Sequence, residues 1–201
     1  MKPGLTSKFL VVFGHGREEG LGCALRDFVS EQLTAATADF RMHDLLQDGF
    51  DPVLRLKAGQ KIALPPEHYE DALAHQYCQD VLWADVLVFI HPVWWFGMPA
   101  IMKGWLDRIL VEGIAITQDA GGSPVGLLKQ KKVILIQTFG TNKVIEQTLF
   151  ASMARKYWKR AVILPTGAQP FLPFSLHSAD DVTPKRFVQF CDEIKGALLG
   201  R

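Results

Sequence analysis

The sequence predicts an α/β protein: a three-layer sandwich in which helices cover both faces of a five-stranded parallel sheet with strand order 2-1-3-4-5. Short runs of continuously apolar residues recur along the chain, which is typical of strands buried on both faces of such a sheet. Helical patterns separate the runs, and parallel neighbours need helical crossovers that are almost always right-handed. The 201 residues show no linker and no internal repeat, so we expect one domain over residues 1–201.

The expected elements follow in order along the chain. Apolar runs predict buried strands, and one alternating run predicts a half-exposed strand, at 8–13, 39–43 (the alternating one), 85–90, 132–137 and 161–164. Helical spacing and helix-starting prolines predict helices at 23–33, 65–83, 99–110, 144–158 and 183–199. Ligands in open sheets of this kind bind beyond the carboxyl ends of the strands, where the strand order reverses. The loops after Phe13, Ile90 and Gln137 are therefore the expected site.

Composition argues against several classes of protein. The 22 basic and 21 acidic side chains give a net charge of +1, which offers no broad positive field for a nucleic-acid partner. Three widely spaced cysteines, Cys23, Cys78 and Cys191, make neither a disulfide framework nor a zinc site, so we expect small buried apolar side chains and a reducing compartment. No apolar run approaches the ~18 residues of a membrane helix, and the N-terminus lacks the apolar core of a signal peptide. We expect a cytoplasmic protein without a membrane span.

A glycine-rich loop, residues 14–22, follows the first strand. Glycines before a helix let backbone amides approach a phosphate at the helix N-terminus, and His15 and Arg17 could add contacts to the anion. Against this interpretation, the spacing is not GxGxxG, the loop carries two adjacent glutamates, and it has no hydroxyl group. Two interpretations stay open: a phosphate site that includes His15, Arg17 and Gly22, or a tight turn from strand to helix.

An aromatic loop follows the third strand. It contains Trp94, Trp95 and Phe96, and three consecutive aromatic side chains in a loop cannot all face the core. Such a wall suits a planar aromatic ligand, whose polar edge the loop amides could bind while Gly97 permits close approach. The alternative is a contact between subunits, because Trp and Phe are enriched at protein interfaces.

The segment from Pro92 to Leu110 reads PVWWFGMPAIMKGWLDRIL. It closely resembles the signature of the flavodoxin-like NAD(P)H:quinone oxidoreductases, also called the NAD(P)H dehydrogenase (quinone) or DT-diaphorase family. The resemblance continues more weakly over most of residues 8–140, including Gln137–Gly140, and fades afterwards.

This resemblance implies a flavin enzyme with a flavodoxin-like fold. It places the flavin ring against Pro92, Val93, Trp94, Trp95, Phe96 and Gly97 of one loop and Gln137, Thr138, Phe139 and Gly140 of another, with the phosphate end at the first loop. NADH or NADPH would deliver hydride and leave, and a quinone or similar acceptor would then take two electrons, so no acid or base from the chain is required. FMN is preferred to FAD, because the short C-terminal portion leaves little chain to house an adenosine. Relatives are usually homodimers with the site at the subunit boundary, which implies a homodimer here.

Three departures from the family pattern bear on the site. The first loop keeps only His15 of the family's series, and Gly20-Leu21-Gly22 replaces its polar positions. Phe139 stands where many relatives have glycine, so its ring is expected to narrow the acceptor pocket and to exclude bulky quinones. The tyrosine and histidine that some relatives place after this loop are missing, and Tyr157 and His177 are alternatives by residue type only.

Two other clusters favour structural interpretations. His68 and His75 lie on one face of an expected helix, but no third ligand completes a metal set, so a solvated face is preferred. Lys129, Lys131 and Lys132 precede a strand and are preferred as a solvated edge, although the pyrophosphate of a nicotinamide nucleotide could use them.

Two other functions compete with a quinone reductase. The altered first loop could leave a non-catalytic flavodoxin-like interaction module, or an ancillary regulatory subunit, with weakened flavin binding. A flavodoxin that only shuttles single electrons is less favoured, because flavodoxins are typically acidic and lack the segment 92–110.

Overall fold

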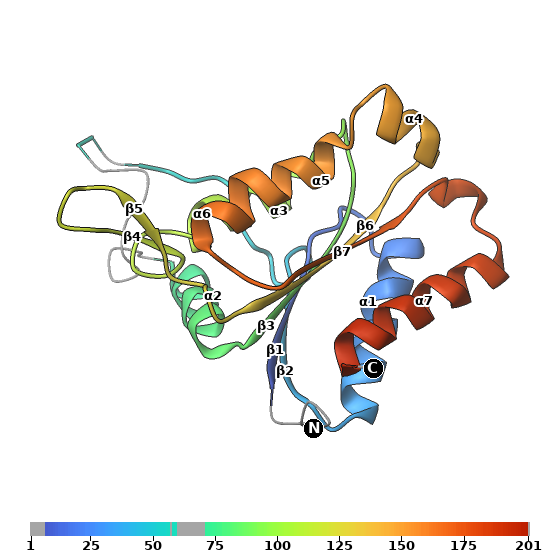
Figure 1. The fold of residues 1–201 in the computed structure, drawn as a ribbon. Coiled ribbons are helices and arrows are strands. Elements are labelled where there is room, and N and C mark those ends of the chain that lie inside the picture. The colour runs from blue at the N-terminus through green and yellow to red at the C-terminus, as the bar shows by residue number, and fades with distance from the viewer. Residues whose placement is uncertain (1–6, 57, 60–70, 201) are drawn as a thin grey trace.

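The computed structural model describes residues 7–56, 58–59 and 71–200, and it confirms the predicted α/β architecture (Figure 1). Five parallel strands form the central sheet. In spatial order they are β2 (Asp39–Asp44), β1 (Lys8–Phe13), β3 (Val86–Pro92), β6 (Lys132–Thr138) and β7 (Phe171–Leu176). The register pairs Phe13 with Ile90 and Ile90 with Ile136, so β1, β3 and β6 end at the same edge. The predicted strand order is confirmed.

Helices cover both faces of this sheet (Figure 1). One layer consists of α1 (Leu21–Ala35) and α7 (Pro184–Leu199). The other consists of α2 (Ala72–Trp83), α3 (Ala100–Ile109) and a helical segment at 153–166, in which α5 (Met153–Tyr157), a π-helical stretch (Trp158–Ile163) and α6 (Leu164–Thr166) follow one another without a break. The expected helices at 23–33, 99–110 and 183–199 are thereby confirmed.

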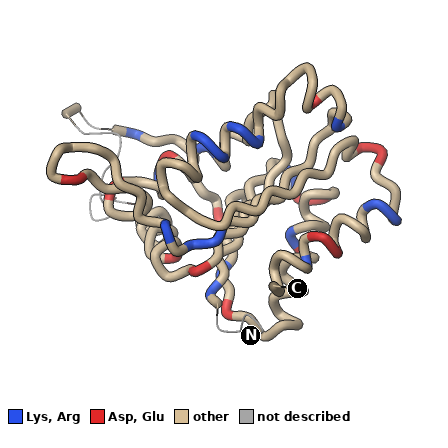
Figure 2. Tube along the Cα trace, in the orientation of Figure 1, with Lys and Arg blue, Asp and Glu red and all other residues tan. Residues whose placement is uncertain are grey.

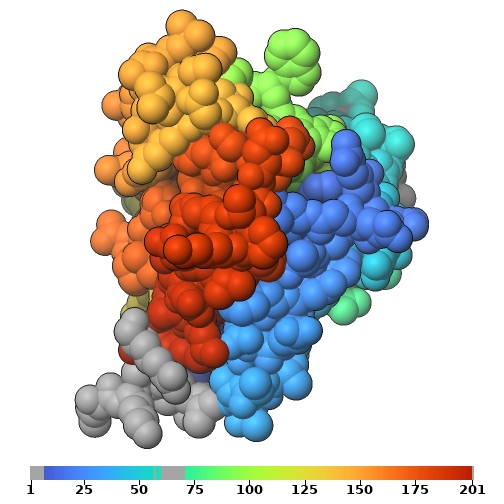
Figure 3. Space-filling model, turned by 90° about the vertical axis from the view of Figure 1, so that its right-hand side faces the viewer, coloured from blue at the N-terminus to red at the C-terminus, as the bar shows by residue number. Residues whose placement is uncertain are grey.

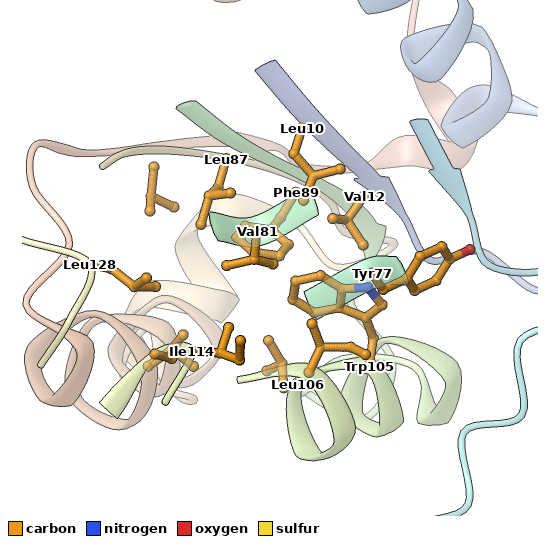
Figure 4. Packing of buried hydrophobic residues seen from close by; sticks show 14 of the residues in the cluster. Leu10, Val12, Tyr77, Val81, Leu87, Phe89, Trp105, Leu106, Ile114 and Leu128 are labelled. Carbon is orange, nitrogen blue, oxygen red and sulfur yellow. The ribbon is translucent and has the colours of Figure 1, made fainter. Parts of the chain in front are cut away.

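The two hydrophobic cores follow from the alternation of side chains along the strands. Leu87 and Phe89 point into the core on the side of α2 and α3, whereas Val88 and Ile90 point into the core on the side of α1 and α7. Figure 4 shows the first of these cores, where Trp105 of α3 lies under the strands. The second core contains Cys23 and Cys191, and the first contains Cys78, so the expectation of buried, apolar cysteines is confirmed.

The fifth strand lies elsewhere than predicted. The run Ala161–Leu164 is helical, with Val162 and Ile163 buried on the same side as Trp158, and β7 is formed by Phe171–Leu176 instead. A four-residue apolar run cannot be distinguished from a turn of buried helix by periodicity alone. β7 is an edge strand of half-buried residues that contains Pro173, and such a strand gives a weak sequence signal.

Three smaller differences complete the fold. The expected helix at 144–158 is interrupted, because α4 (Lys143–Thr148) ends before Ala151 and Ser152, which have positive φ angles of 50° and 55°. Strands β4 (Ile116–Gln118) and β5 (Pro124–Gly126) form an unpredicted antiparallel hairpin, and a short 3₁₀ helix covers Ala179–Asp181. α2 begins at Ala72 after its N-cap Asp71, and the expected start at residues 65–66 and the His68 interpretation lie outside the described residues.

The basic cluster before β6 has a structural role. Lys131 Nζ donates to the carbonyl of Leu82 (3.0 Å) and to that of Ala84 at the end of α2, and Lys132 Nζ donates to the carbonyl of Ala197 near the end of α7 (2.5 Å). These lysines satisfy carbonyls at helix C-termini at the amino edge of the sheet, which is the edge away from the expected site. Basic side chains are instead exposed along the helical segment 153–166 (Figure 2).

The helices of the described part of the chain include none that combines the length and the apolar character of a membrane-spanning helix.

Candidate functional site

Three loops meet at the carboxyl edge of the sheet, after β1, β3 and β6. The sheet ladder continues into them, because the N–H of Gly14 donates to the carbonyl of Ile90 (3.0 Å) and the N–H of Val93 donates to that of Thr138 (2.8 Å). In Figure 3 the loop after β3, in green, stands out at the top of the molecule, close to the first loop in blue and to α4 in yellow-orange. The structure thus brings the predicted loops together.

His15 is a packed element of the first loop. Its ring is almost fully buried, stacks on Phe13 and lies over Gly22, where an added Cβ would come within 2.6 Å of His15 Cδ2. The backbone N–H of Arg17 donates to Nδ1 of His15 (3.0 Å), so this nitrogen is an acceptor and the ring is neutral. Burial, with a smaller contribution from the Arg17 charge, lowers the pKa of His15. His15 therefore shapes the loop, and Gly22 is required by that packing.

The N-terminus of α1 opens toward this loop. Its N-cap is Gly20, with a φ of 116° and no side-chain cap, so the first-turn N–H groups receive no hydrogen bond from a capping side chain. Uncapped amides and the helix dipole favour an anion here, whereas the exposed Glu18 and Glu19 oppose one. The exposed Arg17 is the cation nearest to them along the chain.

The aromatic loop forms a strained turn. Trp94 and Gly97 exchange two backbone hydrogen bonds of 3.1 and 2.9 Å, and the central residues Trp95 and Phe96 have φ angles of 49° and 57°. Two positive φ angles define a type I′ turn, which favours Asn-Gly and penalises bulky side chains. Among the described residues, none accepts a hydrogen bond from the N–H of Trp95 or of Phe96, so both amides are available at the tip. Strain of this kind is concentrated at functional sites.

The aromatic rings of this turn lie in three different environments. The Trp95 side chain is 99% exposed, and Phe96 stacks on Phe150 with 3.5 Å between ring centroids. The Trp94 side chain extends toward the first loop. A Cβ added at Gly16 would lie only 3.0 Å from Cη2 of the Trp94 indole ring. The ring of Trp94 therefore connects two of the three loops.

The loop after β6 is fastened to the end of β7. The N–H of Phe139 donates to the carbonyl of Leu176 (2.8 Å), and the N–H of Ser178 donates to that of Thr141 (3.2 Å). The Phe139 ring is only 2% exposed and stacks on His177 behind the loop. The sequence suggested that this ring narrows an acceptor pocket, but the ring is covered by the chain that follows β7 and is not exposed at the loop surface. Gly140, by contrast, is exposed at the loop surface.

A buried polar group supports the ends of β3 and β6 from below. His91 Nδ1–H donates to the carbonyl of Pro92 (2.7 Å), and Nε2 accepts from the indole N–H of Trp158 (3.0 Å). These bonds fix one neutral tautomer, and complete burial lowers the pKa of His91 to about 4. Gln137 lies beside His91, with 3.4 Å between the Nε2 atoms, and its buried Oε1 has no partner among the described residues. Gln137 is therefore below the site and its side chain is not on the site surface.

His177 and Tyr157 do not take the places of the missing polar residues. His177 lies behind the β6 loop, 3.7 Å from the buried carboxylate of Glu146, and burial is the largest cause of its lowered pKa. Tyr157 is on the exposed side of α5. The buried roles of His91, Trp158 and Glu146 could not be predicted from the sequence, because their contacts join residues far apart in the chain.

A five-stranded parallel sheet in the order β2-β1-β3-β6-β7, with helices on both faces, is the architecture of the flavodoxin-like class of α/β proteins. Residues 7–195 match the model of a protein family described as having a flavodoxin-like fold. The chain belongs to this family, and the resemblance seen in the sequence is confirmed.

Known relatives carry oxidoreductase names. The chain is 32% identical over 136 residues to an uncharacterized NAD(P)H oxidoreductase of Haemophilus influenzae, with 66% of this chain and 64% of the relative covered. It is 28% identical over 149 residues to the Cavia porcellus NAD(P)H dehydrogenase [quinone] 1, with 67% of this chain and 54% of the relative covered. The matched part thus spans less than two thirds of either relative's length.

A solved structure confirms the fold. The FMN-dependent NADH-azoreductase of Bacillus anthracis, solved in complex with FMN, superimposes with a TM-score of 0.74 at 16% identity, covering 96% of this chain and 98% of that one. At this identity the likeness establishes the architecture alone.

Proposed function

We propose that the protein is an NAD(P)H-dependent flavin oxidoreductase that reduces quinones or similar planar acceptors by two electrons. The observation that carries the proposal is the strained Trp95–Phe96 turn, which presents two free amides and an aromatic wall at the carboxyl edge of the sheet. An isoalloxazine ring has a flat apolar surface and a polar edge of acceptors and donors, which such a turn complements.

The residues present fit a flavin. The amides of Trp95 and Phe96 would bind the polar edge of the ring, and the exposed backbone at Gly140 would face it from the other side. The uncapped N-terminus of α1 and Arg17 would hold the phosphate. The N–H groups replace the hydroxyl ligands that the first loop lacks. The remaining predicted residues would have structural roles. The shape of the loops after β1 and β3 would depend on His15, Gly22, Pro92, Val93 and Trp94. The loop after β6 would be supported by Gln137, Thr138 and Phe139.

The chain's contribution would be to bind and orient the flavin and the acceptor. A bound flavin would supply the redox chemistry, taking two electrons from NADH or NADPH and passing them to the acceptor in a ping-pong sequence. The site surface is apolar at Trp94, Trp95 and Phe96, which favours planar aromatic molecules over charged ones. His91 lies beneath the sheet edge as a neutral, fully hydrogen-bonded imidazole, so it holds Trp158 and Pro92 in place and takes no part in proton transfer.

FMN is the preferred flavin. The Bacillus anthracis structure solved with FMN has almost the same length as this chain, since the match covers 96% of this chain and 98% of that one, and this supports the smaller cofactor. The donor's identity as NADH or NADPH stays open in the proposal, and a cytoplasmic location is proposed from the cysteine usage alone.

A homodimer is also proposed, because apolar side chains are exposed beside the aromatic turn. Those on α4, the following loop and the helical segment 153–166 are Val144, Leu149, Met153, Tyr157 and Leu164, which are 70%, 74%, 53%, 37% and 75% exposed. The Phe96–Phe150 stack joins this surface to the turn. Exposed apolar patches of this kind mark protein interfaces, and a second copy is the partner that a shared site requires.

Reconstitution tests the proposed function. Protein stripped of small molecules is titrated with FMN or FAD by fluorescence quenching, and then assayed for NAD(P)H oxidation with and without benzoquinone. We expect one flavin per chain and acceptor-dependent turnover. A protein that binds neither flavin supports the non-catalytic interaction module, for which the two adjacent glutamates and the missing hydroxyl groups of the first loop are the favouring observations.

A further inference from the structure

Most of the backbone strain in the described residues surrounds one pair of stacked rings. Six non-glycine residues have positive φ angles, and four of them are Trp95, Phe96, Ala151 and Ser152. The first two form the tip of the aromatic turn, and the last two follow Phe150 directly. Phe96 and Phe150 stack with 3.5 Å between centroids and 17° between planes. Two strained segments, more than fifty residues apart in the sequence, thus meet through these two rings.

The segment that carries Phe150 is anchored on its far side. The N–H of Ser152 donates to the carbonyl of Glu146 (3.0 Å), and the N–H of Met153 donates to that of Phe150 (3.0 Å). Glu146 itself is a buried residue of α4 and lies beside His177. The left-handed residues after Phe150 therefore turn the chain between two hydrogen-bonded points, and the ring of Phe150 projects from a fixed base.

The turn that carries Phe96 is anchored before its tip, by the hydrogen bond from Val93 to Thr138, but its tip has no comparable support. Its two cross-turn hydrogen bonds close only the four residues from Trp94 to Gly97, and Trp95 is fully exposed. Bulky side chains disfavour the left-handed conformation of a type I′ turn, so this conformation persists only where surrounding contacts hold it. The stack on Phe150 is the one ring contact that Phe96 makes among the described residues.

We infer that Phe150 is a positioning residue whose ring holds Phe96 and so keeps the Trp95–Phe96 amides directed at the flavin edge. The inference rests on the proposed function for the identity of the ligand, but its structural part concerns the free protein. Phe150 touches no reacting atom in this account. It acts only through Phe96, and an aromatic ring at position 150 is the requirement.

The test uses Phe150→Ala with Phe40→Ala as the matched control. Phe40 is also half-buried, but it lies on β2, where its side chain packs against the α1–α7 core. Amide exchange in the flavin-free protein reports opening of the turn at the N–H groups of Trp94 and Gly97, which are hydrogen-bonded. We expect Phe150→Ala to speed their exchange by about tenfold and Phe40→Ala to leave it unchanged.

Flavin affinity provides the second measurement. Phe150→Ala should raise the Kd for FMN about tenfold, and Phe150→Tyr, which retains the ring, should restore the wild-type value. If Phe150 acts through Phe96, the double variant Phe96→Ala/Phe150→Ala should bind FMN no more weakly than Phe96→Ala alone. If Phe150→Ala does not fold, Phe150→Leu keeps the volume and removes the ring, and the same results are expected of it.

Three outcomes distinguish a failure of the role inferred for Phe150 from a failure of the proposed flavin binding. Unchanged exchange at Trp94 and Gly97 in Phe150→Ala would overturn the inference, and so would additive losses of affinity in the double variant. A wild-type protein that binds no flavin would overturn the proposed function, while the exchange measurement would still decide whether Phe150 holds the turn.

Discussion

His91 makes the stability of the protein depend on pH in a direction that the structure fixes. The imidazole is buried and neutral, with Nδ1–H bonded to Pro92 and Nε2 accepting from Trp158. Because its pKa falls from 6.5 in the unfolded chain to about 4 in the fold, the unfolded state binds a proton first as the pH drops. The contribution of His91 to stability is therefore complete above about pH 6.5 and is lost progressively toward pH 4.

The size of this effect follows from the same pKa values. One pKa unit corresponds to about 1.4 kcal/mol, and at about pH 5 the unfolded imidazole is protonated while most folded molecules are not. The free energy of unfolding should thus fall by about 2 kcal/mol between roughly pH 7.5 and pH 5 through His91 alone. His15, His43 and His177 also have lowered pKa values and add to the total loss.

Comparison of wild type with His91→Gln isolates the contribution of His91 to the pH dependence of stability. A glutamine oxygen can accept from Trp158 but does not titrate, and the other five histidines are common to both proteins. Urea unfolding, followed by tryptophan fluorescence at the two pH values, should show a loss in wild type that exceeds the loss in the variant by about 2 kcal/mol. Equal losses in the two proteins would mean that His91 is not held neutral, and the hydrogen-bonding scheme would be refuted.

Three further predictions concern other parts of the chain. Gly22→Ala places a Cβ within 2.6 Å of His15, so the free energy of unfolding should fall by roughly 1–3 kcal/mol in urea and FMN binding should weaken. Phe139→Ala removes a buried ring from His177 and should cost roughly 3–5 kcal/mol in the same assay, with no change in selectivity between large and small quinones. Light scattering should give about twice the chain mass for wild type and about one chain mass for Leu164→Asp.

Each of these predictions has a contradicting result. Wild-type stability in Gly22→Ala would show that the His15 ring moves aside freely. A Phe139→Ala protein of unchanged stability that gains activity with bulky quinones would place that ring in the acceptor pocket, as the sequence alone suggested. A wild-type monomer at micromolar concentration would require the exposed apolar side chains to serve another purpose.

The sheet was largely predictable because its inner strands are apolar on both faces. The runs before Gly14 and His91 have no helical spacing, and each is followed by a loop of a different character. The fifth strand was not predictable in the same way. Phe171–Leu176 lies at the edge and is half-buried on both faces up to Ser175, whereas Ala161–Leu164 is an apolar turn within a helix.

The site was predictable at the level of loops and much less at the level of side chains. Three adjacent aromatic residues indicated that the chain after β3 leaves the core, and the exposure of Trp95 agrees with this. The buried ring of Phe139 and the stack of Phe96 on Phe150 depend on how the loops after β6 and α4 turn back on the sheet. Contacts between residues so far apart in the chain cannot be predicted from the local sequence.

A crystal structure of the protein grown with FMN would show where the flavin binds. We expect the flavin ring against Trp94–Gly97, hydrogen bonds from the amides of Trp95 and Phe96 to its polar edge, and the phosphate at the N-terminus of α1. A flavin bound elsewhere, or a phosphate held away from residues 15–22, would contradict the assignment of the site.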